Sequence, residues 1–342
     1  KYDERYVKKI ESRYSQSQKE KVVRKKVSPV IIHNVYQCMK DCCSLSDYHR
    51  LSLIRERKIS LARIEQDYFT CPTNWRQKDT IIARIKEKYP AYTDEILMNI
   101  PGFFYDKKRG KLSFTGHKGL GILIRNSDSR IVAIQIRKDT IQEGDSRYIW
   151  FSSSFATYNP DEYNGGNGCG SPKDVCYPQM LKKHTLCITE GRFKSEKLTE
   201  SGNINISVQG VTSWHGIEET IKHMNGIHNV FIFFDADILG KHVLFMQSEK
   251  MIRKIQDEFP GLYIRYAFWS KKNGKGIDDC IIAGNISKVK YYEAKRAAEI
   301  CNDAYTHALG EYHVANLREL KQERAKEFED YLQILTESML GL

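Results

Sequence analysis

The second half of the chain alternates short apolar runs with longer segments whose apolar positions recur every three or four residues. The short runs predict four buried strands, over His184–Thr189, Ile204–Val208, Asn229–Phe234 and Leu262–Phe268. The intervening segments predict helices over Arg192–Glu200, Ile217–His223 and Lys241–Phe259. Strands that alternate with helices at this spacing indicate a mainly parallel sheet with right-handed crossovers.

The first part of the chain is polar, with helical spacing of its apolar positions. Residues 1–95 predict a helical module that begins with a charged arm over residues 1–27. Candidate helices open at Ser46 and after Ser60, where a serine precedes apolar residues at helical spacing. A third spans Trp75–Tyr89, and a short helical turn is expected over 93–99.

Between these parts, residues 96–160 break into short strands divided by Gly, Asn and Asp turns. The strands are expected over Lys111–Thr115, Gly121–Arg125, Ile131–Arg137 and Tyr148–Ser152. They predict a small basic α+β subdomain. Residues 161–181 are rich in Gly, Pro and Asn and predict a loop. A catalytic domain is then expected over 182–286, and C-terminal helices over 287–342.

Charge and cysteine content bear on the binding partner of the protein and on the compartment in which it folds. The 342 residues carry a net charge of +11, and residues 1–27 hold ten Lys and Arg against four Asp and Glu. This excess favours a polyanionic partner, although a merely solvated tail is the alternative. Nine cysteines without a signal peptide favour a reducing cytosol, and Cys38, Cys42 and Cys43 fit a buried helix face better than a zinc site. No apolar run is long enough to cross a membrane.

Acidic residues follow the predicted strands where these end. Glu190 ends the first strand and precedes Gly191, and Asp235 and Asp237 follow the third. Open α/β sheets bind their ligands at these strand ends, so we expect the three carboxylates to bind Mg²⁺ or Mn²⁺. Asp235 and Asp237 are expected to share one face of the strand end, with capping acids as the alternative. Asp278-Asp279 follows the fourth strand and offers further metal ligands or a helix cap.

Basic and aromatic residues suggest where nucleic acid or nucleotide would bind. The candidates are Arg109, Lys111, Arg137, Lys138, Arg147, Tyr148 and Trp150. Cations of this kind contact phosphates, and the aromatic rings stack on unpaired bases, although ordinary strand alternation gives a similar pattern. Lys194 and Lys241 stand at helix starts near the acids, where they would offset acidic charge, contact a triphosphate or face solvent.

The order Glu-Gly, Asp-x-Asp and Asp-Asp, each after a strand, resembles the Toprim domain over about residues 182–285. Residues 121–152 resemble the basic subdomain that precedes Toprim in DnaG-type bacterial primases. The segment Leu53–Ser60 resembles the N-terminal region of Toprim primase-like proteins of phages and other mobile elements. The chain departs from cellular primases in lacking a recognisable zinc ribbon and helicase-binding domain. Lys194 stands where many primases have an acid.

This resemblance implies an α/β Toprim domain with helices on both faces of its sheet, preceded by the basic subdomain and flanked by helices. It also implies a DNA primase, a nucleotidyltransferase that copies single-stranded DNA from nucleoside triphosphates with Mg²⁺ or Mn²⁺. Glu190, Asp235 and Asp237 would be its catalytic residues. A replicative helicase or a zinc-module chain would be further partners, in the cytosol of a bacterium or of a phage's host. The alternatives are a Toprim nuclease and a non-catalytic nucleic-acid-binding module.

Overall fold

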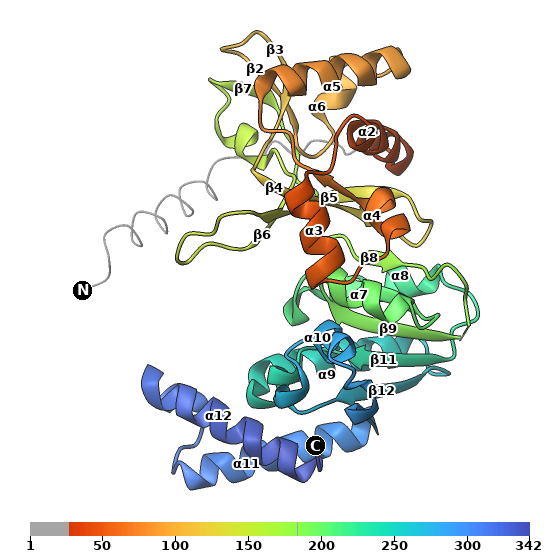
Figure 1. Ribbon diagram of the computed structural model, residues 1–342. Helices are drawn as coiled ribbons and strands as arrows, with labels where there is room; N and C mark the ends of the chain where they lie inside the picture. Colours follow the sequence, from red (N-terminus) through yellow and green to blue (C-terminus); the bar gives the residue numbers. More distant parts are fainter. Residues whose placement is uncertain (1–26, 183) are drawn as a thin grey trace. The chain divides into compact units, whose positions relative to one another are not determined.

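The computed structural model describes residues 27–182 and 184–342 (Figure 1). The chain divides into two compact units. The N-terminal unit comprises residues up to 52, 60–124 and 130–172, and the C-terminal unit comprises 53–59, 125–129 and 173–342. The basic arm expected over residues 1–27 lies outside the described residues, except for Val27. Among the helices of the described part, none is long and apolar enough to span a membrane.

The N-terminal unit holds two small antiparallel sheets. One has the order β1-β4-β5-β6, with β1 at Tyr68–Thr70, β4 at Gly119–Arg125, β5 at Ile131–Lys138 and β6 at Tyr148–Trp150. The other has the order β3-β2-β7, with β2 at Phe103–Asp106, β3 at Lys111–Phe114 and β7 at Tyr163–Gly165. The helical elements of this unit are α2 (Pro29–Asp41), α3 (Asp47–Leu51), α4 (Leu61–Asp67), α5 (Trp75–Lys88), α6 (Asp94–Met98) and η2 (Ser154–Tyr158). The π-helix η1 (Ser52–Glu56) belongs, from Leu53 on, to the C-terminal unit.

Short polar residues begin the helices of this unit. The side chains of Ser46 and Ser60 accept hydrogen bonds from the backbone N–H groups of His49 and Arg63, as the serines in the sequence indicate. Helices α2 and α5 pack on the sheets over an aromatic core in which Tyr36, Phe103, Phe114 and Phe151 are buried. Cys38 lies on the buried face of α2, whereas Cys42 is exposed.

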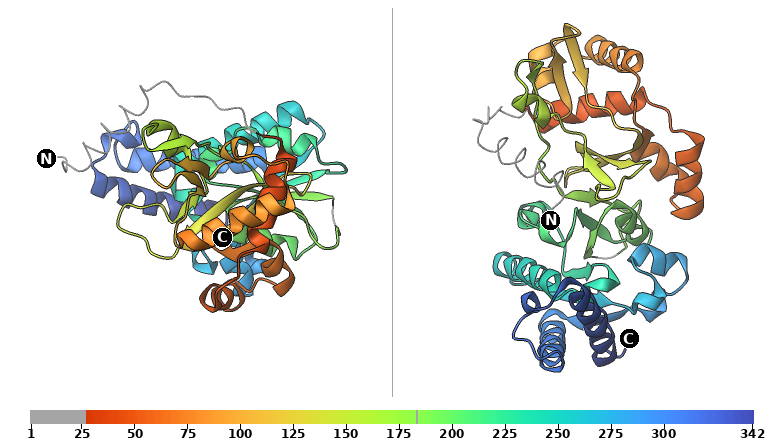
Figure 2. Two further views of the ribbon diagram at one scale, coloured as in Figure 1. Left: turned by 90° about the horizontal axis from the view of Figure 1, so that it is seen from above. Right: turned by 90° about the vertical axis from the view of Figure 1, so that its left-hand side faces the viewer.

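The C-terminal unit is built on a six-stranded sheet with the order β13-β12-β11-β9-β10-β8 (Figures 1 and 2). Strands β9 (Thr185–Glu190), β10 (Ile204–Val208), β11 (Asn229–Phe233) and β12 (Tyr263–Phe268) are mutually parallel, as the apolar runs predicted. The edge strands β8 (Asp174–Cys176) and β13 (Lys290–Glu293) run antiparallel to their neighbours. Strand β8 lies where the sequence predicted a loop, and β13 lies where it predicted a helix.

Helices cover both faces of this sheet, and each face has its own apolar cluster. Helices α7 (Arg192–Thr199) and α10 (Ile277–Ile282) bury Leu198, Ile277 and Cys280 with the strand residues Cys187 and Phe233. The opposite cluster includes residues of α8 (Ile217–Lys222), α9 (His242–Glu258) and α11 (Ala294–Glu311). Alternate strand residues thus face opposite layers, which explains why the strands are apolar throughout rather than at every second position.

The C-terminal helices form a pair. Helix α12 (Gln322–Met339) packs beside α11 (Figures 1 and 2). Phe328 and Leu332 of α12 are buried in one apolar cluster with Ala304 and Ala308 of α11. The sequence predicted helices over 287–342, but strand β13 forms near the start of this range and α11 begins only at Ala294. Lys290–Glu293 pairs with β12 through backbone hydrogen bonds, and this long-range pairing outweighs the local helical pattern. Shorter helical turns complete the unit: η3 (Val211–Ser213), η4 (Ala236–Gly240), η5 (Lys271–Asn273), η6 (Ile286–Lys288) and η7 (Leu317–Glu319).

Candidate active site

Three neighbouring parallel strands bring the predicted acids together at one edge of the C-terminal unit's sheet. Glu190 is the last residue of β9, and Asp235 follows the end of β11 by two residues. Asp278 lies in the first turn of α10, after β12. Because β9, β11 and β12 are adjacent and parallel, their carboxyl ends meet at the same edge. The fold therefore places there residues that lie 88 positions apart in the sequence.

Asp235 and Asp237 converge through a turn rather than through strand alternation. Strand β11 ends at Phe233, and Asp235 caps the 3-10 helix η4, in which Asp237 is the second residue. The ammonium of Lys275 nevertheless lies 3.8 Å from Asp235 Oδ2 and 3.6 Å from Asp237 Oδ2. The prediction that Asp235 and Asp237 share one face of a strand end is thus wrong, because both residues follow the strand. Both carboxylates nevertheless contact the same lysine.

Each aspartate also has a lysine of its own. Lys194 Nζ lies 2.6 Å from Asp235 Oδ1, and Lys241 Nζ lies 2.7 Å from Asp237 Oδ2. Burial alone would lower the pKa of Lys194, but the neighbouring Asp235 raises it. Burial would raise the pKa of Asp237, but the hydrogen bond from Lys241 lowers it. The Lys194 ammonium and the Asp237 carboxylate are therefore charged near neutral pH.

Glu190 differs electrostatically from the two aspartates. Burial, followed by repulsion from Asp235, raises the pKa of its carboxyl above the usual range. Attraction to Lys194 only partly offsets these effects. A carboxylate with a raised pKa is a better proton acceptor than an ordinary surface glutamate, so Glu190 suits a general base.

The two acids at the start of α10 have different surroundings. Asp279 Oδ2 accepts a hydrogen bond from the backbone N–H of Gly276 at 3.2 Å, which is the capping role that the sequence left open. Asp278 is buried, and its Oδ2 accepts a hydrogen bond from Arg57 Nη1 at 3.1 Å. Burial first, then repulsion from Asp279, raises the pKa of Asp278.

The carboxylates have the chemistry of divalent-cation ligands. Within residues 27–182 and 184–342, no three His, Cys, Asp or Glu side chains are grouped as the ligands of a metal ion would be. Lysines lie among the acids instead, but Lys241 and Lys275 are 38% and 60% exposed and can turn towards solvent. Asp235 Oδ1 is enclosed, and the Lys194 ammonium lies against it at 2.6 Å. Oxygens of this kind fit a hard cation, so ligation by Glu190, Asp235 and Asp237 stays a prediction compatible with the site.

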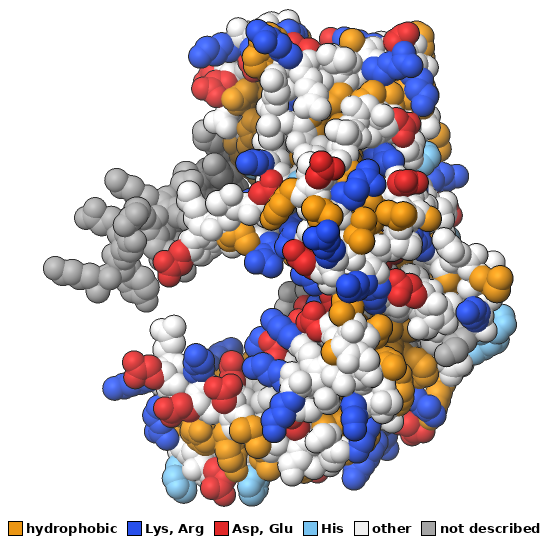
Figure 3. All heavy atoms as spheres, viewed as in Figure 1, with side chains coloured by type: hydrophobic (Ala, Val, Ile, Leu, Met, Phe, Trp, Pro, Cys, Tyr) orange, Lys and Arg blue, Asp and Glu red, His pale blue; other side chains and the backbone are white. Residues whose placement is uncertain are grey.

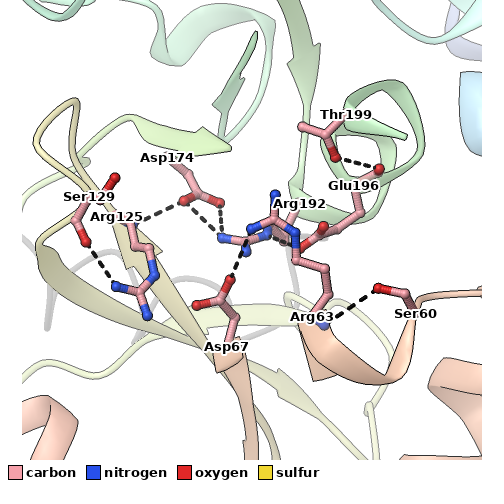
Figure 4. A network of polar contacts seen from close by, with 9 residues as sticks. All are labelled: Ser60, Arg63, Asp67, Arg125, Ser129, Asp174, Arg192, Glu196 and Thr199. Atoms are coloured by element: carbon pink, nitrogen blue, oxygen red, sulfur yellow. Dashed lines mark hydrogen bonds and ion pairs between the residues drawn. The ribbon is translucent and has the colours of Figure 1, made fainter. Parts of the chain in front are cut away.

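A buried ionic network holds the helix that follows Glu190 (Figure 4). Arg192, in the first turn of α7, donates to both oxygens of Asp174 at 3.1 Å and to Glu196 at 2.7 Å. Asp174 Oδ1 also accepts from the backbone N–H of Arg125 at 3.1 Å. The three side chains of the Arg192 pairs are at most 2% exposed, so the start of α7 is fixed in place next to the acids.

Helix α12 holds the turn that carries Asp235 and Asp237. Gln333 Nε2 donates to the backbone carbonyl of Ala236 at 3.0 Å, and its Oε1 accepts from the N–H of Gly240 at 2.8 Å. A Cβ at Gly240 would approach the Glu329 carbonyl to 2.5 Å, so the helix can lie this close only against glycine. The C-terminal helix thus packs against the turn and supports the candidate site directly.

Some of the predicted nucleic-acid-binding residues meet on one sheet of the N-terminal unit. Arg137 on β5 lies opposite Tyr148 on β6, and Trp150 lies opposite Gln135. Because positions i and i+2 share a face, Arg137, Tyr148 and Trp150 form one partly exposed surface. Arg137 Nε is enclosed without a hydrogen-bond partner in the described part of the chain. Arg147 is exposed beside this surface, and Lys138 instead pairs with Asp145 at 2.7 Å.

Arg109 and Lys111 lie elsewhere, on the β2–β3 hairpin of the other sheet. Both contact Asp79, at 2.9 and 2.5 Å, and both cations lie over the ring of Trp75. Trp75 is 52% exposed and belongs to α5. The residues predicted to bind nucleic acid therefore do not form a single patch. Asp79 offsets part of the positive charge of Arg109 and Lys111.

Sequence reasoning missed three residues of the acid site. Arg57 pairs with Asp278, Lys275 lies between the two aspartates, and Gly276 borders Lys194. The basic, glycine-containing run from Lys271 to Gly276 was a signal for the second and third. Nothing in the sequence around Arg57 indicates that it belongs to the acid site, because only the fold brings its segment to the start of α10.

Comparison with known families covers the acid site but assigns it no activity. A family model described as "Domain of unknown function (DUF3854)" matches residues 177–287, which include β9 to α10 and all the acids discussed above. None of the curated proteins matches the chain.

Several solved structures of primases share the fold. The RNA polymerase domain of Mycobacterium tuberculosis primase DnaG superposes with a TM-score of 0.54 at 15% identity, covering 90% of this chain and 98% of that one. The Aquifex aeolicus primase (zinc binding and RNA polymerase domains) gives 0.52 at 11%, covering 92% and 76%. A DnaG primase catalytic domain bound to ssDNA gives 0.51 at 14%, covering 89% and 99%. The chain is therefore similar in its mixed α/β fold to the catalytic domains of DnaG-type primases.

Proposed function

We propose that this chain is a divergent Toprim primase of the kind found in phages and other mobile elements. It would synthesise short primers on single-stranded DNA by metal-dependent nucleotidyl transfer. The observation that carries the proposal is the meeting of Glu190, Asp235 and Asp237 at the carboxyl ends of adjacent parallel strands. The similarity in fold to primase catalytic domains supports it.

The residues of the site suit the steps of this reaction. Glu190, Asp235 and Asp237 would hold Mg²⁺ or Mn²⁺, which when bound neutralises phosphate charge during phosphoryl transfer. Glu190, whose pKa is raised, would accept the proton of the primer 3′-hydroxyl. The oxygen forms its bond to the α-phosphorus of a nucleoside triphosphate, and pyrophosphate leaves. Lys241 and Lys275, which are partly exposed, would pair with triphosphate oxygens when they turn from the aspartates.

The N-terminal unit would hold the template. Arg137 supplies a cation for a phosphate, and Tyr148 and Trp150 supply rings on which unpaired bases stack. One of the similar structures is described as bound to ssDNA. A replicative helicase or a separate zinc-module chain would be further partners of the proposed primase.

Primer synthesis on a single-stranded template tests the proposal. The chain is incubated with single-stranded DNA, labelled ribonucleotides or deoxyribonucleotides, and Mg²⁺ or Mn²⁺. We expect short products that Asp235→Asn and Asp237→Asn reduce by about a hundredfold or more, because each removes a charge from the reacting site. Asp303→Asn is the matched control, since Asp303 is an exposed acid on α11 of the same unit. Normal synthesis by either site variant would disprove the proposed roles.

A second candidate is a nucleic-acid-binding module without chemistry. The observation that favours it is the pairing of both aspartates with lysines, which leaves neither carboxylate without a cation. Tight binding of single-stranded DNA with no products under any of the conditions would support this candidate. Shortened template without synthesis would instead indicate a Toprim nuclease that uses the same acids.

A further inference from the structure

Lys194 is the least exposed of the three lysines among the acids. Its ammonium lies 2.6 Å from Asp235 Oδ1, and its side chain is 18% exposed, against 38% for Lys241 and 60% for Lys275. Glu190 and Asp278 also attract it, after Asp235. The charge of Lys194 is therefore placed inside the cluster, between the ends of three strands.

The position of Lys194 is not one that a helix favours for a cation. It is the third residue of α7, where the partial positive charge of the helix N-terminus repels it. The buried pairs of Arg192 with Asp174 and Glu196 fix the start of this helix. A hydrogen bond of 2.9 Å between Thr189 and Ser195 ties the same turn to β9. The acids, and not the helix, stabilise the ammonium at this place.

Gly276 provides the space for the Lys194 side chain. A Cβ at position 276 would lie 2.7 Å from Lys194 Cε and 2.3 Å from Asp278 Oδ1. The φ angle of Gly276 is −94°, which every residue adopts, so the backbone does not require glycine there. A side chain at position 276 would instead displace the ends of the Lys194 and Asp278 side chains. Glycine at 276 thus leaves the Lys194 side chain its present path.

Charge balance limits what else the cluster can hold. Apart from Asp279, which is exposed and caps α10, the acids of the cluster are Glu190, Asp235, Asp237 and Asp278, which carry four negative charges when ionised. Lys194 and Arg57 are the two cations that the packing fixes, since Arg57 is held by Asp278 and by the ring of Phe193. Two negative charges remain once Lys241 and Lys275 turn to solvent, and one divalent cation balances them. A second divalent cation would have to approach the ammonium of Lys194.

We propose that Lys194 is a permanent cation of this site, taking the place of one divalent metal ion, so that the cluster holds a single divalent ion on its Glu190–Asp237 side. This inference rests on the proposed function, because it concerns the ions of the same site. It also predicts that Lys194 lowers the affinity of the cluster for metal, rather than acting as an accessory contact to substrate.

Binding of Mn²⁺, measured by electron paramagnetic resonance on the full chain without nucleotide or DNA, tests the inference. We expect one Mn²⁺ per chain. Lys194→Gln should bind two, or one about tenfold or more tighter, because a unit charge a few ångströms away repels the metal strongly even at an effective dielectric constant of about 20. Lys194→Met, which keeps the length of the side chain, should act in the same way if Lys194→Gln does not fold. Lys250→Gln, which removes an exposed lysine of α9, is the control and should bind one.

The outcomes separate this inference from the proposed function. Two Mn²⁺ in the unmodified chain, or the same number and affinity in both Lys194 variants, would overturn the role of Lys194. Primer synthesis by a chain that binds two ions would leave the proposed function standing. No Mn²⁺ in the unmodified chain but one in Lys194→Gln would support Lys194 as the resident cation and remove the proposed metal chemistry. No Mn²⁺ in any variant would overturn both.

Discussion

Glu190 illustrates how a candidate catalytic residue opposes the stability of the fold that positions it. Burial and the nearby Asp235 raise the pKa of its carboxyl, so the folded chain binds a proton at Glu190 more readily than the unfolded chain does. The free energy of unfolding therefore falls as the pH rises through the unfolded pKa towards the folded one. Above that range, the ionised carboxylate is a constant cost to folding.

We expect Glu190→Gln to raise the melting temperature by about 2 °C at pH 8, because it removes a buried charge without changing the shape of the side chain. The gain should diminish as the pH falls through the raised pKa of Glu190 towards that of an unfolded glutamate, where the carboxyl takes up its proton. Thermal melts from pH 4 to pH 8 would measure both effects. Glu327→Gln, on the exposed side of α12, is the control and should change nothing. A lower melting temperature, or a gain independent of pH, would contradict the electrostatic explanation.

Among the elements, α12 positions loops of the acid site although it lies far from them in the sequence. It lies about 95 residues after the aspartates, yet Gln333 hydrogen-bonds the backbone of η4 on both sides of Asp237. Glu337, one turn further on, accepts from the N–H of Lys271, in the loop that leads to Lys275 and Gly276. One helix thus positions two of the loops that form the acid site.

Gln333→Leu should lower the free energy of unfolding by about 2 kcal/mol, because two backbone groups of η4 lose their hydrogen-bond partner. The amide of Gly240 should exchange its hydrogen faster, since its acceptor is removed. Urea unfolding and hydrogen exchange measure these two changes. Ile334→Gln, at an adjacent position that is 70% exposed, serves as the control. Unchanged exchange at Gly240 would show that α12 does not hold the turn.

At the scale of the whole molecule, charge is unevenly divided along the chain. Residues 1–26 hold ten Lys and Arg against four Asp and Glu, which is more than half of the net charge of +11. On the face shown in Figure 3, basic and acidic side chains are interspersed over the described surface of both units. Binding to a polyanion should therefore depend strongly on the arm.

Removal of residues 1–27 should weaken binding to single-stranded DNA and reduce its dependence on salt. Each phosphate contact that is lost should lower the slope of log K against log salt concentration by about 0.7. Fluorescence anisotropy between low and physiological salt would measure the slope. A chain whose arm is scrambled at constant composition should keep the slope, because the interaction is electrostatic. An unchanged slope after removal would show that the arm takes no part.

The sequence by itself determined the parallel core and the acids at its edge. Strands β9 to β12 and helices α7 to α9 follow from apolar runs and helical spacing, since each pattern is local. The positions of Glu190 and Asp235 follow for the same reason, because each comes directly after an apolar run. The shared edge of the sheet then follows from the right-handed parallel topology.

Only the tertiary structure decided which groups accompany these acids. The edge strands β8 and β13 depend on pairing with distant partners, which local propensity does not encode. Arg57, Lys275 and Gln333 reach the site from three separate segments. Of these, only Lys275 lies in a run, Lys271 to Gly276, whose composition signals a site. Likewise, the sequence left the role of Lys194 open between three readings. Its ion pair with Asp235 and the space left by Gly276 exist only after β9, β11 and β12 have brought their ends together.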